Sequence, residues 1–119
     1  MTADAEQDRA PDSDLVSIIM PTYNCGAFIG ETIATVQAQT YSHWELLVVD
    51  DCSTDDTAEV VASLAKSDPR IRYVRLETNS GAAMARNRAM ELAQGRYMAF
   101  LDSDDLWHPD KLRRQIDFM

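Results

Sequence analysis

Three carboxylates stand within four residues at the end of an apolar run. The run is Tyr97–Leu101, and the tetrad that follows it is Asp102-Ser103-Asp104-Asp105. Carboxylates this close repel one another, and partial burial raises the cost unless a cation lies among them. Oxygen ligands suit a hard divalent ion such as Mg²⁺ or Mn²⁺, which keeps coordination positions free for phosphate oxygens. The tetrad therefore predicts a site for a metal-bound phosphate compound. The competing interpretation is a solvated turn or helix cap, for which Asp and Ser are equally typical.

Two further polar segments follow apolar runs. Asp50-Asp51 closes the run Leu46–Val49. The pair is typical of a turn, but a carboxylate at a strand end can also accept the imide N–H of a uracil. Tyr23, shortly after the run Val16–Met20, is suited to stacking on such a base and equally to a place at the edge of the core.

A third segment, Asn79-Ser80-Gly81, precedes a helical pattern that contains Arg86. Gly81 suits a tight entry into the helix, whose first N–H groups favour phosphate. Arg86 falls in the second turn, where it could reach a diphosphate or the acidic tetrad, or form a surface salt bridge.

Apolar runs alternate with helical patterns along the chain. Strands are expected at Val16–Met20, Leu46–Val49, Ile71–Leu76 and Tyr97–Leu101. Helices are expected from four apolar stripes: Ile29, Ile33 and Val36; Val60, Val61 and Leu64; Ala82, Ala85, Ala89 and Leu92; Leu112, Ile116 and Met119. Arg72 and Arg75 mark the third strand as an edge strand. Ser53 with Asp56 predicts a capping box, Gly95 a helix stop and Pro109 the first turn of the last helix.

This alternation predicts an α/β fold with a Rossmann-like, doubly wound, mostly parallel sheet. In such sheets ligands bind beyond the carboxyl ends of the strands, where the winding reverses. Three polar segments fall at those ends: Pro21–Asn24 after the first expected strand, Asp50-Asp51 after the second and Asp102–Asp104 after the fourth. The last helix runs to Met119 without a cap, so the sequence is expected to be a truncated part of a larger domain.

Composition bounds the remaining possibilities. The 119 residues are 45% hydrophobic with a formal net charge of −9, enough apolar content for one domain with a core. Residues 1–14 carry a net charge of −4 and almost no large apolar side chain, which predicts a disordered acidic lead-in before a domain at 15–119. The acidic balance disfavours nucleic acid as a partner. No secretory signal and no membrane-spanning run is found, which predicts a cytoplasmic protein. Reduced thiols are expected at Cys25 and Cys52, and solvated turn positions at His43 and His108.

The motifs together resemble the N-terminal, nucleotide-sugar-binding half of the inverting glycosyltransferases of family 2, which have the GT-A fold. The resemblance covers Leu15 to Met119, and the sequence is also similar to the teichuronic-acid-type branch. The matching segments are Val16–Asn24, Gln39–Tyr41, Trp44–Leu46, Val49–Asp55, Asn79–Gly81, Ala85–Asn87, Gly95–Tyr97 and Phe100–Asp105. Cys52 departs from the pattern, because Gly or Asn is common at its position.

The resemblance implies a role for each matching residue. The metal, Mg²⁺ or Mn²⁺, would be held by Asp104 and Asp102. The nucleotide would be bound by Pro21, Thr22, Tyr23, Asn24, Asp51, Arg86, Asp102 and Ser103.

The resemblance also implies an activity. The donor would be a nucleotide-diphospho-sugar, a UDP-sugar by preference, and the sugar would pass with inversion to a hydroxyl of a saccharide or lipid-linked acceptor in cell-surface polysaccharide synthesis. Peripheral association with the inner face of the membrane would fit such an acceptor. The catalytic base would lie beyond Met119, so no catalytic residue is expected in this chain, which alone would bind donor without transferring sugar.

Three other classes of protein share parts of this pattern. A response-regulator receiver needs an acidic pair after its first strand and a Lys after a fifth, and neither is present. A sugar-1-phosphate nucleotidyltransferase needs a Gly-rich loop after its first strand, where Pro21-Thr22-Tyr23-Asn24 stands instead. A nucleotide-binding module without transferase activity stays open.

Overall fold

Four apolar segments form one parallel sheet in the computed structural model, which describes residues 14–118. The strands are β1 (Val16–Thr22), β2 (Trp44–Asp50), β3 (Ile71–Arg75) and β4 (Tyr97–Phe100). Their order is β3-β2-β1-β4, and each neighbouring pair is parallel. The prediction that the third strand lies at an edge is confirmed.

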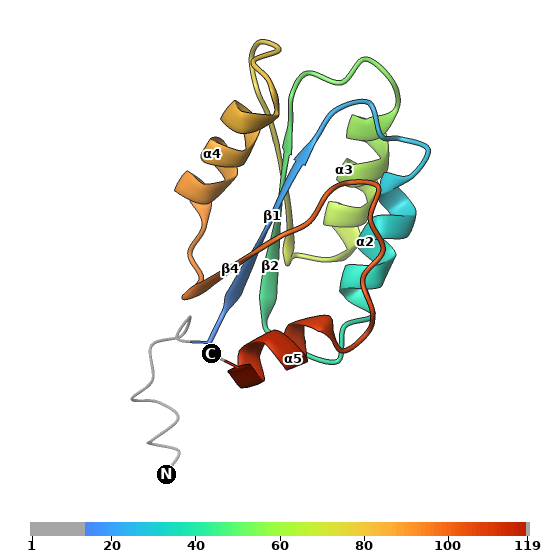
Figure 1. The fold of residues 1–119 in the computed structure, drawn as a ribbon. Helices are drawn as coiled ribbons and strands as arrows, with labels where there is room; N and C mark the ends of the chain where they lie inside the picture. Colours follow the sequence, from blue (N-terminus) through green and yellow to red (C-terminus); the bar gives the residue numbers. More distant parts are fainter. Residues whose placement is uncertain (1–13, 119) are drawn as a thin grey trace.

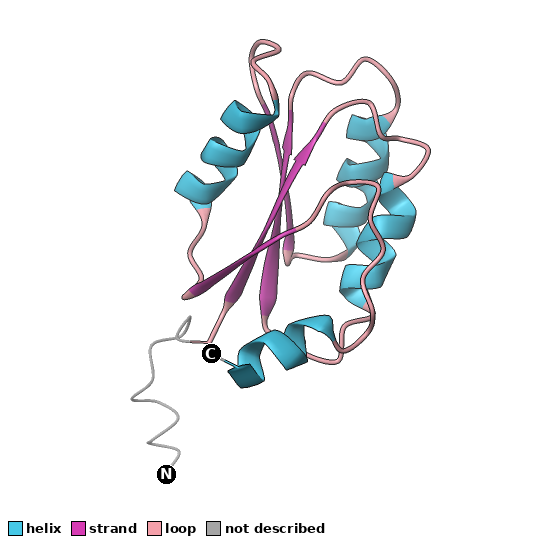
Figure 2. Ribbon diagram, in the orientation of Figure 1, coloured by secondary structure: helices cyan, strands magenta, loops and turns pink. Residues whose placement is uncertain are grey.

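Helices cover both faces of this sheet (Figures 1 and 2). They are α2 (Ile29–Gln37), α3 (Thr57–Ser67), α4 (Ala82–Leu92) and α5 (Lys111–Phe118). Helices α2 and α3 lie on one face and α4 lies on the other, while α5 crosses near the amino ends of the strands on the side of α2.

The core has one apolar cluster on each face, because alternate residues of a strand point to opposite sides. On the larger side, Ile18 and Met20 of β1 pack with Ile33 of α2 and Leu112 of α5. The other cluster joins Ile19, Leu47 and Val49 to two alanines of α4, Ala85 and Ala89, both fully buried. Both alanines belong to the predicted small-residue stripe.

The winding reverses at β1. The chain passes from β1 to β2 and β3 in one direction across the sheet and then returns to place β4 on the other side of β1. The predicted α/β doubly wound parallel sheet is therefore confirmed, and the loops after β1, β2 and β4 meet at one edge.

Three local predictions were wrong. Helix α3 begins at Thr57 rather than beside Ser53, whose hydroxyl donates to Asp50 and caps no helix. Helix α4 ends at Leu92, and Gly95 is required for a different reason: a Cβ there would lie 2.5 Å from the carbonyl oxygen of Leu15. Pro109 precedes α5 by two residues instead of lying in its first turn.

The acidic lead-in lies outside the described residues, apart from Asp14. The carbonyl oxygen of Asp14 accepts a hydrogen bond from the hydroxyl of Tyr41. Among the described helices, none has the length and apolar content needed to cross a membrane.

Candidate functional site

A cavity of about 360 Å³ opens at the carboxyl edge of the sheet, on the α4 side. Its lining residues come from the end of β1, the end of β2 and the start of α4: Pro21, Thr22, Tyr23, Asp51, Asn79, Gly81, Ala82 and Ala85. Four predicted nucleotide-binding residues, separated by up to thirty positions in the chain, thus share one cavity: Pro21, Thr22, Tyr23 and Asp51.

Tyr23 and Thr22 present different surfaces to this cavity. Tyr23 is 48% exposed, so its side chain can stack on a planar ligand. The hydroxyl of Thr22 is buried and has no hydrogen-bond partner within residues 14–118.

Asp51 lines the cavity and connects the end of β2 to the loop before α4. Its two carboxylate oxygens accept hydrogen bonds from the backbone N–H groups of Ser80 (2.6 Å) and Gly81 (2.9 Å). Gly81 can serve here because its φ of 98° lies in a region that glycine adopts without strain. Each carboxylate oxygen retains a second acceptor position, so Asp51 can still receive a donor from a ligand. Asp51 thus takes up the N–H groups of Ser80 and Gly81, which precede the first residue of α4, Ala82.

The sequence interpretation did not assign four lining residues to the site: Asn79, Gly81, Ala82 and Ala85. Asn79 was noted only as part of a helix entry, yet its side-chain amide donates to the carbonyl oxygen of Asp51 (3.0 Å) and helps close the cavity. Ala82 was assigned to the packing stripe of the helix but is exposed at the cavity wall. The signal available was the small size of Ala82, which leaves room for a ligand at the start of α4.

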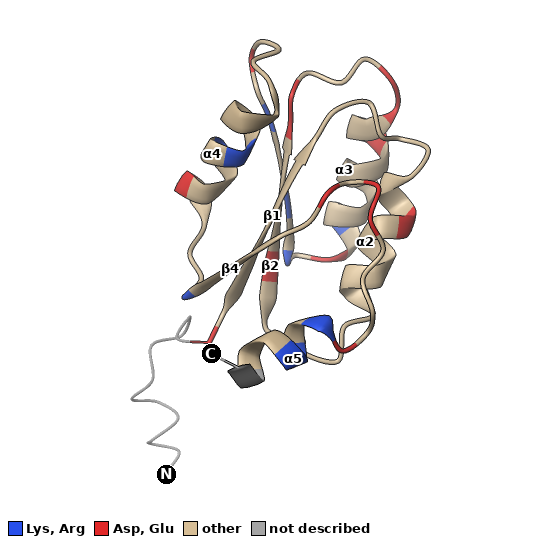
Figure 3. Ribbon diagram, in the orientation of Figure 1, with Lys and Arg blue, Asp and Glu red and all other residues tan. Residues whose placement is uncertain are grey.

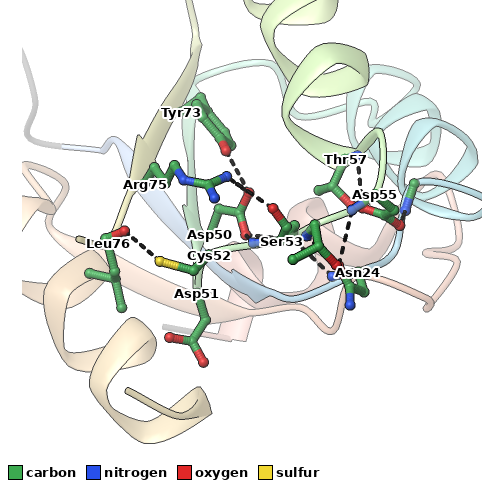
Figure 4. A network of polar contacts seen from close by, with 12 residues as sticks. Asn24, Asp50, Asp51, Cys52, Ser53, Asp55, Thr57, Tyr73, Arg75 and Leu76 are labelled. Carbon is green, nitrogen blue, oxygen red and sulfur yellow. Dashed lines mark hydrogen bonds and ion pairs between the residues drawn. The ribbon is translucent and has the colours of Figure 1, made fainter. Parts of the chain in front are cut away.

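Asn24 does not line the cavity. Its side-chain oxygen accepts hydrogen bonds from the backbone N–H groups of Thr54 (2.8 Å) and Asp55 (3.4 Å), and its own N–H donates to the hydroxyl of Ser53 (2.8 Å). Its φ of 49° is one that Asn tolerates better than most residues. Asn24 therefore joins the loop after β1 to the loop after β2, as Figure 4 shows.

Asp50 lies at the centre of the same network and is fully buried. One carboxylate oxygen accepts from the N–H and the hydroxyl of Ser53, and the other accepts from the hydroxyl of Tyr73 and lies 3.8 Å from a guanidinium nitrogen of Arg75. Asp51 points away from this group in Figure 4. The first aspartate of the pair is thus internal, and the second faces the cavity.

The pKa of Tyr73 is raised to about 12 by this arrangement. Burial contributes most, and the hydrogen bond to the Asp50 carboxylate and its negative charge add to it. In the adjoining loop, the hydroxyl and N–H of Thr57 donate to Asp55 and hold the pKa of that carboxyl below its usual value.

Cys52 adopts a φ of 66°, in the left-handed region. Glycine and asparagine are the residues that reach this region at least cost, which explains physically why either is common at this position in the resembled family. The thiol donates to the carbonyl oxygen of Leu76 (2.9 Å) and so ties the ends of β2 and β3 together. Both cysteines are free thiols.

The acidic tetrad lies in the loop after β4, where it forms a continuous acidic segment (Figure 3). Asp102, Asp104 and Asp105 are exposed, whereas Ser103 is 8% exposed and turned inward. The hydroxyl of Ser103 donates to the sulfur of Cys25 (2.8 Å), so the structure places it away from the cavity. Arg86 is exposed on α4, one turn after Ala82, and does not line the cavity either.

The acidic tetrad is the predicted place for a metal ion. No cluster of three or more His, Cys, Asp or Glu side chains suited to a metal ion occurs in the part of the chain that is described. Asp102 and Asp104 offer exposed carboxylate oxygens within one loop. Magnesium and manganese commonly use one or two protein carboxylates and complete their coordination with phosphate oxygens and water, so the chemistry of this donor pair fits.

The fold and the site define a class: α/β proteins with a cavity at the carboxyl edge of a parallel sheet and an acidic loop after the last strand. The chain belongs to glycosyltransferase family 2, whose model, described as "Glycosyl transferase family 2", matches residues 17–119.

Two curated relatives illustrate the similarity. The chain is 55% identical over 105 residues to TuaG of Bacillus subtilis, whose name places it in teichuronic acid biosynthesis, with 88% of this chain and 42% of TuaG covered. It is 52% identical over 108 residues to WfgD of Escherichia coli, named as a UDP-Glc:alpha-D-GlcNAc-diphosphoundecaprenol beta-1,3-glucosyltransferase, with 91% of this chain and 42% of WfgD covered. The chain thus spans less than half the length of both relatives.

Solved structures agree on the fold. S. aureus TarS 1-349 in complex with UDP has a TM-score of 0.80 and 35% identity, with 87% of this chain and 31% of TarS covered. Mannosyltransferase PcManGT from Pyrobaculum calidifontis, in complex with GDP-Man and Mn²⁺, has a TM-score of 0.74 and 34% identity, with 84% and 31% covered.

Proposed function

We propose that this chain is the donor-binding part of a sugar transferase and binds a UDP-sugar through Mg²⁺ or Mn²⁺. The observation that carries the proposal is the shared cavity of Pro21, Thr22, Tyr23 and Asp51 at the carboxyl edge of the sheet. The UDP and UDP-GlcNAc complexes of TarS support this choice of ligand.

Each residue has a physical task in this proposal. The ring of Tyr23 stacks on the base, and Asp51 accepts the imide N–H with its remaining acceptor positions. Asn24, through its bonds to Thr54 and Asp55, holds the loop that carries Tyr23. Arg86 lies one turn beyond the cavity wall and reaches toward the diphosphate.

Asp102 and Asp104 would hold the metal. When bound, the ion supplies Lewis-acid neutralisation of the charge that develops on the departing diphosphate. Without a cation, the exposed carboxylates of this loop would repel the diphosphate. The complex of PcManGT with Mn²⁺ supports a divalent ion in this fold.

For the whole protein, we propose transfer of the sugar with inversion to a hydroxyl acceptor in cell-surface polysaccharide synthesis. The names of TuaG and WfgD support this assignment, and the diphosphoundecaprenol in the name of WfgD supports a lipid-linked acceptor and a place at the inner face of the membrane.

The test is calorimetric titration with UDP in the presence and absence of Mn²⁺. We expect Asp104→Ala to weaken the Mn²⁺-dependent affinity for UDP by at least about tenfold, because it removes a metal ligand. Asp105→Ala is the matched control, since it removes the same charge from the neighbouring exposed position, and it should change the affinity by less than about twofold. Equal effects of both variants would reject the metal assignment.

A further inference from the structure

The serine within the acidic tetrad connects two loops of the site. Ser103 is 8% exposed, whereas the aspartates on both sides of it are exposed. Its carbonyl oxygen accepts a hydrogen bond from the hydroxyl of Thr32 (2.9 Å), a fully buried residue of α2. Its hydroxyl donates to the sulfur of Cys25 (2.8 Å). The acidic loop is thus anchored at Ser103, and the side chains of Asp102 and Asp104 on either side of it are exposed.

Cys25 continues this connection to the cavity. Its thiol lies 3.2 Å from the carbonyl oxygen of Tyr23 and donates to it. Its backbone N–H donates to the hydroxyl of Thr57 (3.0 Å), at the start of α3. A thiol can donate one hydrogen bond and accept another, so the sulfur fills both roles at once.

These contacts form one continuous path. It runs from the backbone of Tyr23, which lines the cavity, through the Cys25 sulfur to Ser103, between the two proposed metal ligands. A displacement of the acidic loop that breaks or strengthens the bond to Cys25 therefore acts on the backbone that positions the Tyr23 ring.

We propose that Cys25 is a positioning residue that couples occupancy of the acidic loop by a divalent cation to nucleotide binding in the cavity. The inference rests on the proposed function, because it assumes that UDP and a cation bind at these two places. Coupling of this kind is reciprocal: the cation raises the affinity for UDP by the same factor by which UDP raises the affinity for the cation. Part of that factor passes through the sulfur, in addition to direct contact between cation and diphosphate.

The experiment measures the ratio of UDP affinities with and without Mn²⁺. In Cys25→Ala we expect this ratio to fall by about three- to tenfold, with the metal-free affinity for UDP nearly unchanged. Cys25→Ser should retain the ratio, because a hydroxyl also donates and accepts. Cys52→Ala is the control: it removes the other half-buried thiol, which bonds Leu76 and not Ser103. A ratio that is unchanged in Cys25→Ala, or that falls equally in Cys52→Ala, overturns the proposal.

A second measurement needs no ligand and separates this inference from the proposed function. Amide hydrogen exchange at residues 102–105 of the free protein should be faster in Cys25→Ala than in the wild type and unchanged in Cys25→Ser. Ser103→Ala removes the same bond from the other side and serves if Cys25→Ala does not fold by circular dichroism. Unaltered exchange in the folded variant overturns the inference even where UDP and Mn²⁺ bind. If wild-type protein shows no Mn²⁺ effect on UDP, the proposed metal site fails instead.

Discussion

At the scale of single residues, the two adjacent aspartates at the end of β2 have separate tasks. Successive side chains of a strand point to opposite faces, so Asp50 turns toward the α3 side and Asp51 toward the cavity on the α4 side. Asp50 is satisfied by Ser53, Tyr73 and Arg75, and it forms part of the scaffold rather than of the ligand surface.

Tyr73→Phe tests the internal role of Asp50. The variant leaves one oxygen of a buried carboxylate with only the distant Arg75 as a partner, so the free energy of unfolding at pH 7 should fall by about 1–3 kcal/mol. Because the pKa of Tyr73 is about 12 in the folded protein and near 10 when unfolded, its contribution is complete below pH 10 and is lost as the pH rises from 10 to 12. Urea unfolding at several pH values measures the difference between wild type and variant.

The control for this prediction is Tyr97→Phe. The hydroxyl of Tyr97 makes no hydrogen bond to any of residues 14–118, so its removal should change stability by less than about 0.5 kcal/mol. A wild-type advantage over Tyr73→Phe that persists undiminished at pH 12 would contradict the assigned cause.

How far the sequence could predict these residues depends on the kind of information each requires. The apolar run before Asp51 predicts that this residue lies at a strand end. Its place at the cavity could be predicted from that position. The bond from Ser103 to Cys25 could not be predicted, because it joins residues 78 positions apart and depends on how two loops meet. The left-handed backbone conformation of Cys52 could not be predicted either, because a φ of 66° leaves no signature in composition or periodicity.

At the scale of elements, strand and helix positions followed from hydrophobic pattern, whereas helix ends did not. The apolar runs fix which residues must be buried, and the four strands and four helices appear where the pattern placed them. The first and last residues of a helix depend on which polar groups nearby form hydrogen bonds with each other. Ser53 had the spacing of a helix cap, but its hydroxyl donates to Asp50 instead. An unpaired buried carboxylate costs more free energy than an uncapped helix start that is exposed to water.

The turn between α4 and β4 has no room for a methyl group at position 95. In Gly95→Ala the new Cβ would lie 2.5 Å from the Leu15 carbonyl oxygen and 2.7 Å from the hydroxyl of Ser17, to which the N–H of Gly95 now donates. Backbone atoms cannot yield cheaply, so the free energy of unfolding should fall by about 1–3 kcal/mol.

Gly30→Ala is the matched control for that turn. Gly30 lies in α2, and its nearest neighbour would be a methyl group of Val60 at an ordinary 3.7 Å. Alanine there should raise stability by about 0.5–1 kcal/mol, because it favours the helix. Denaturant titration of both variants gives the two signs, and equal destabilisation would show that close approach to β1 is not what requires glycine at position 95.

At the scale of the whole molecule, the charge distribution sets the conditions for binding. The chain carries a formal net charge of −9, and several acidic residues lie in the loops at the carboxyl edge of the sheet (Figure 3). An anionic ligand therefore approaches against a repulsive field, and the proposed cation has to reverse the local sign.

This field predicts an unusual salt dependence. Without metal, the affinity for UDP should rise by about two- to fivefold between roughly 20 mM and 300 mM KCl, because the screening length falls from about 20 Å to about 6 Å and weakens the repulsion. With Mn²⁺ bound, the attraction between cation and diphosphate is screened instead, so the same increase in salt should lower the affinity. Uridine, which is uncharged and would stack on Tyr23 in the proposed way, should bind with little dependence on salt under both conditions. Calorimetric titration at the two salt concentrations measures all three cases. A metal-free affinity for UDP that falls with salt would mean that Arg86 and its neighbours dominate the field, and that the acidic loop does not require a cation to accept a diphosphate.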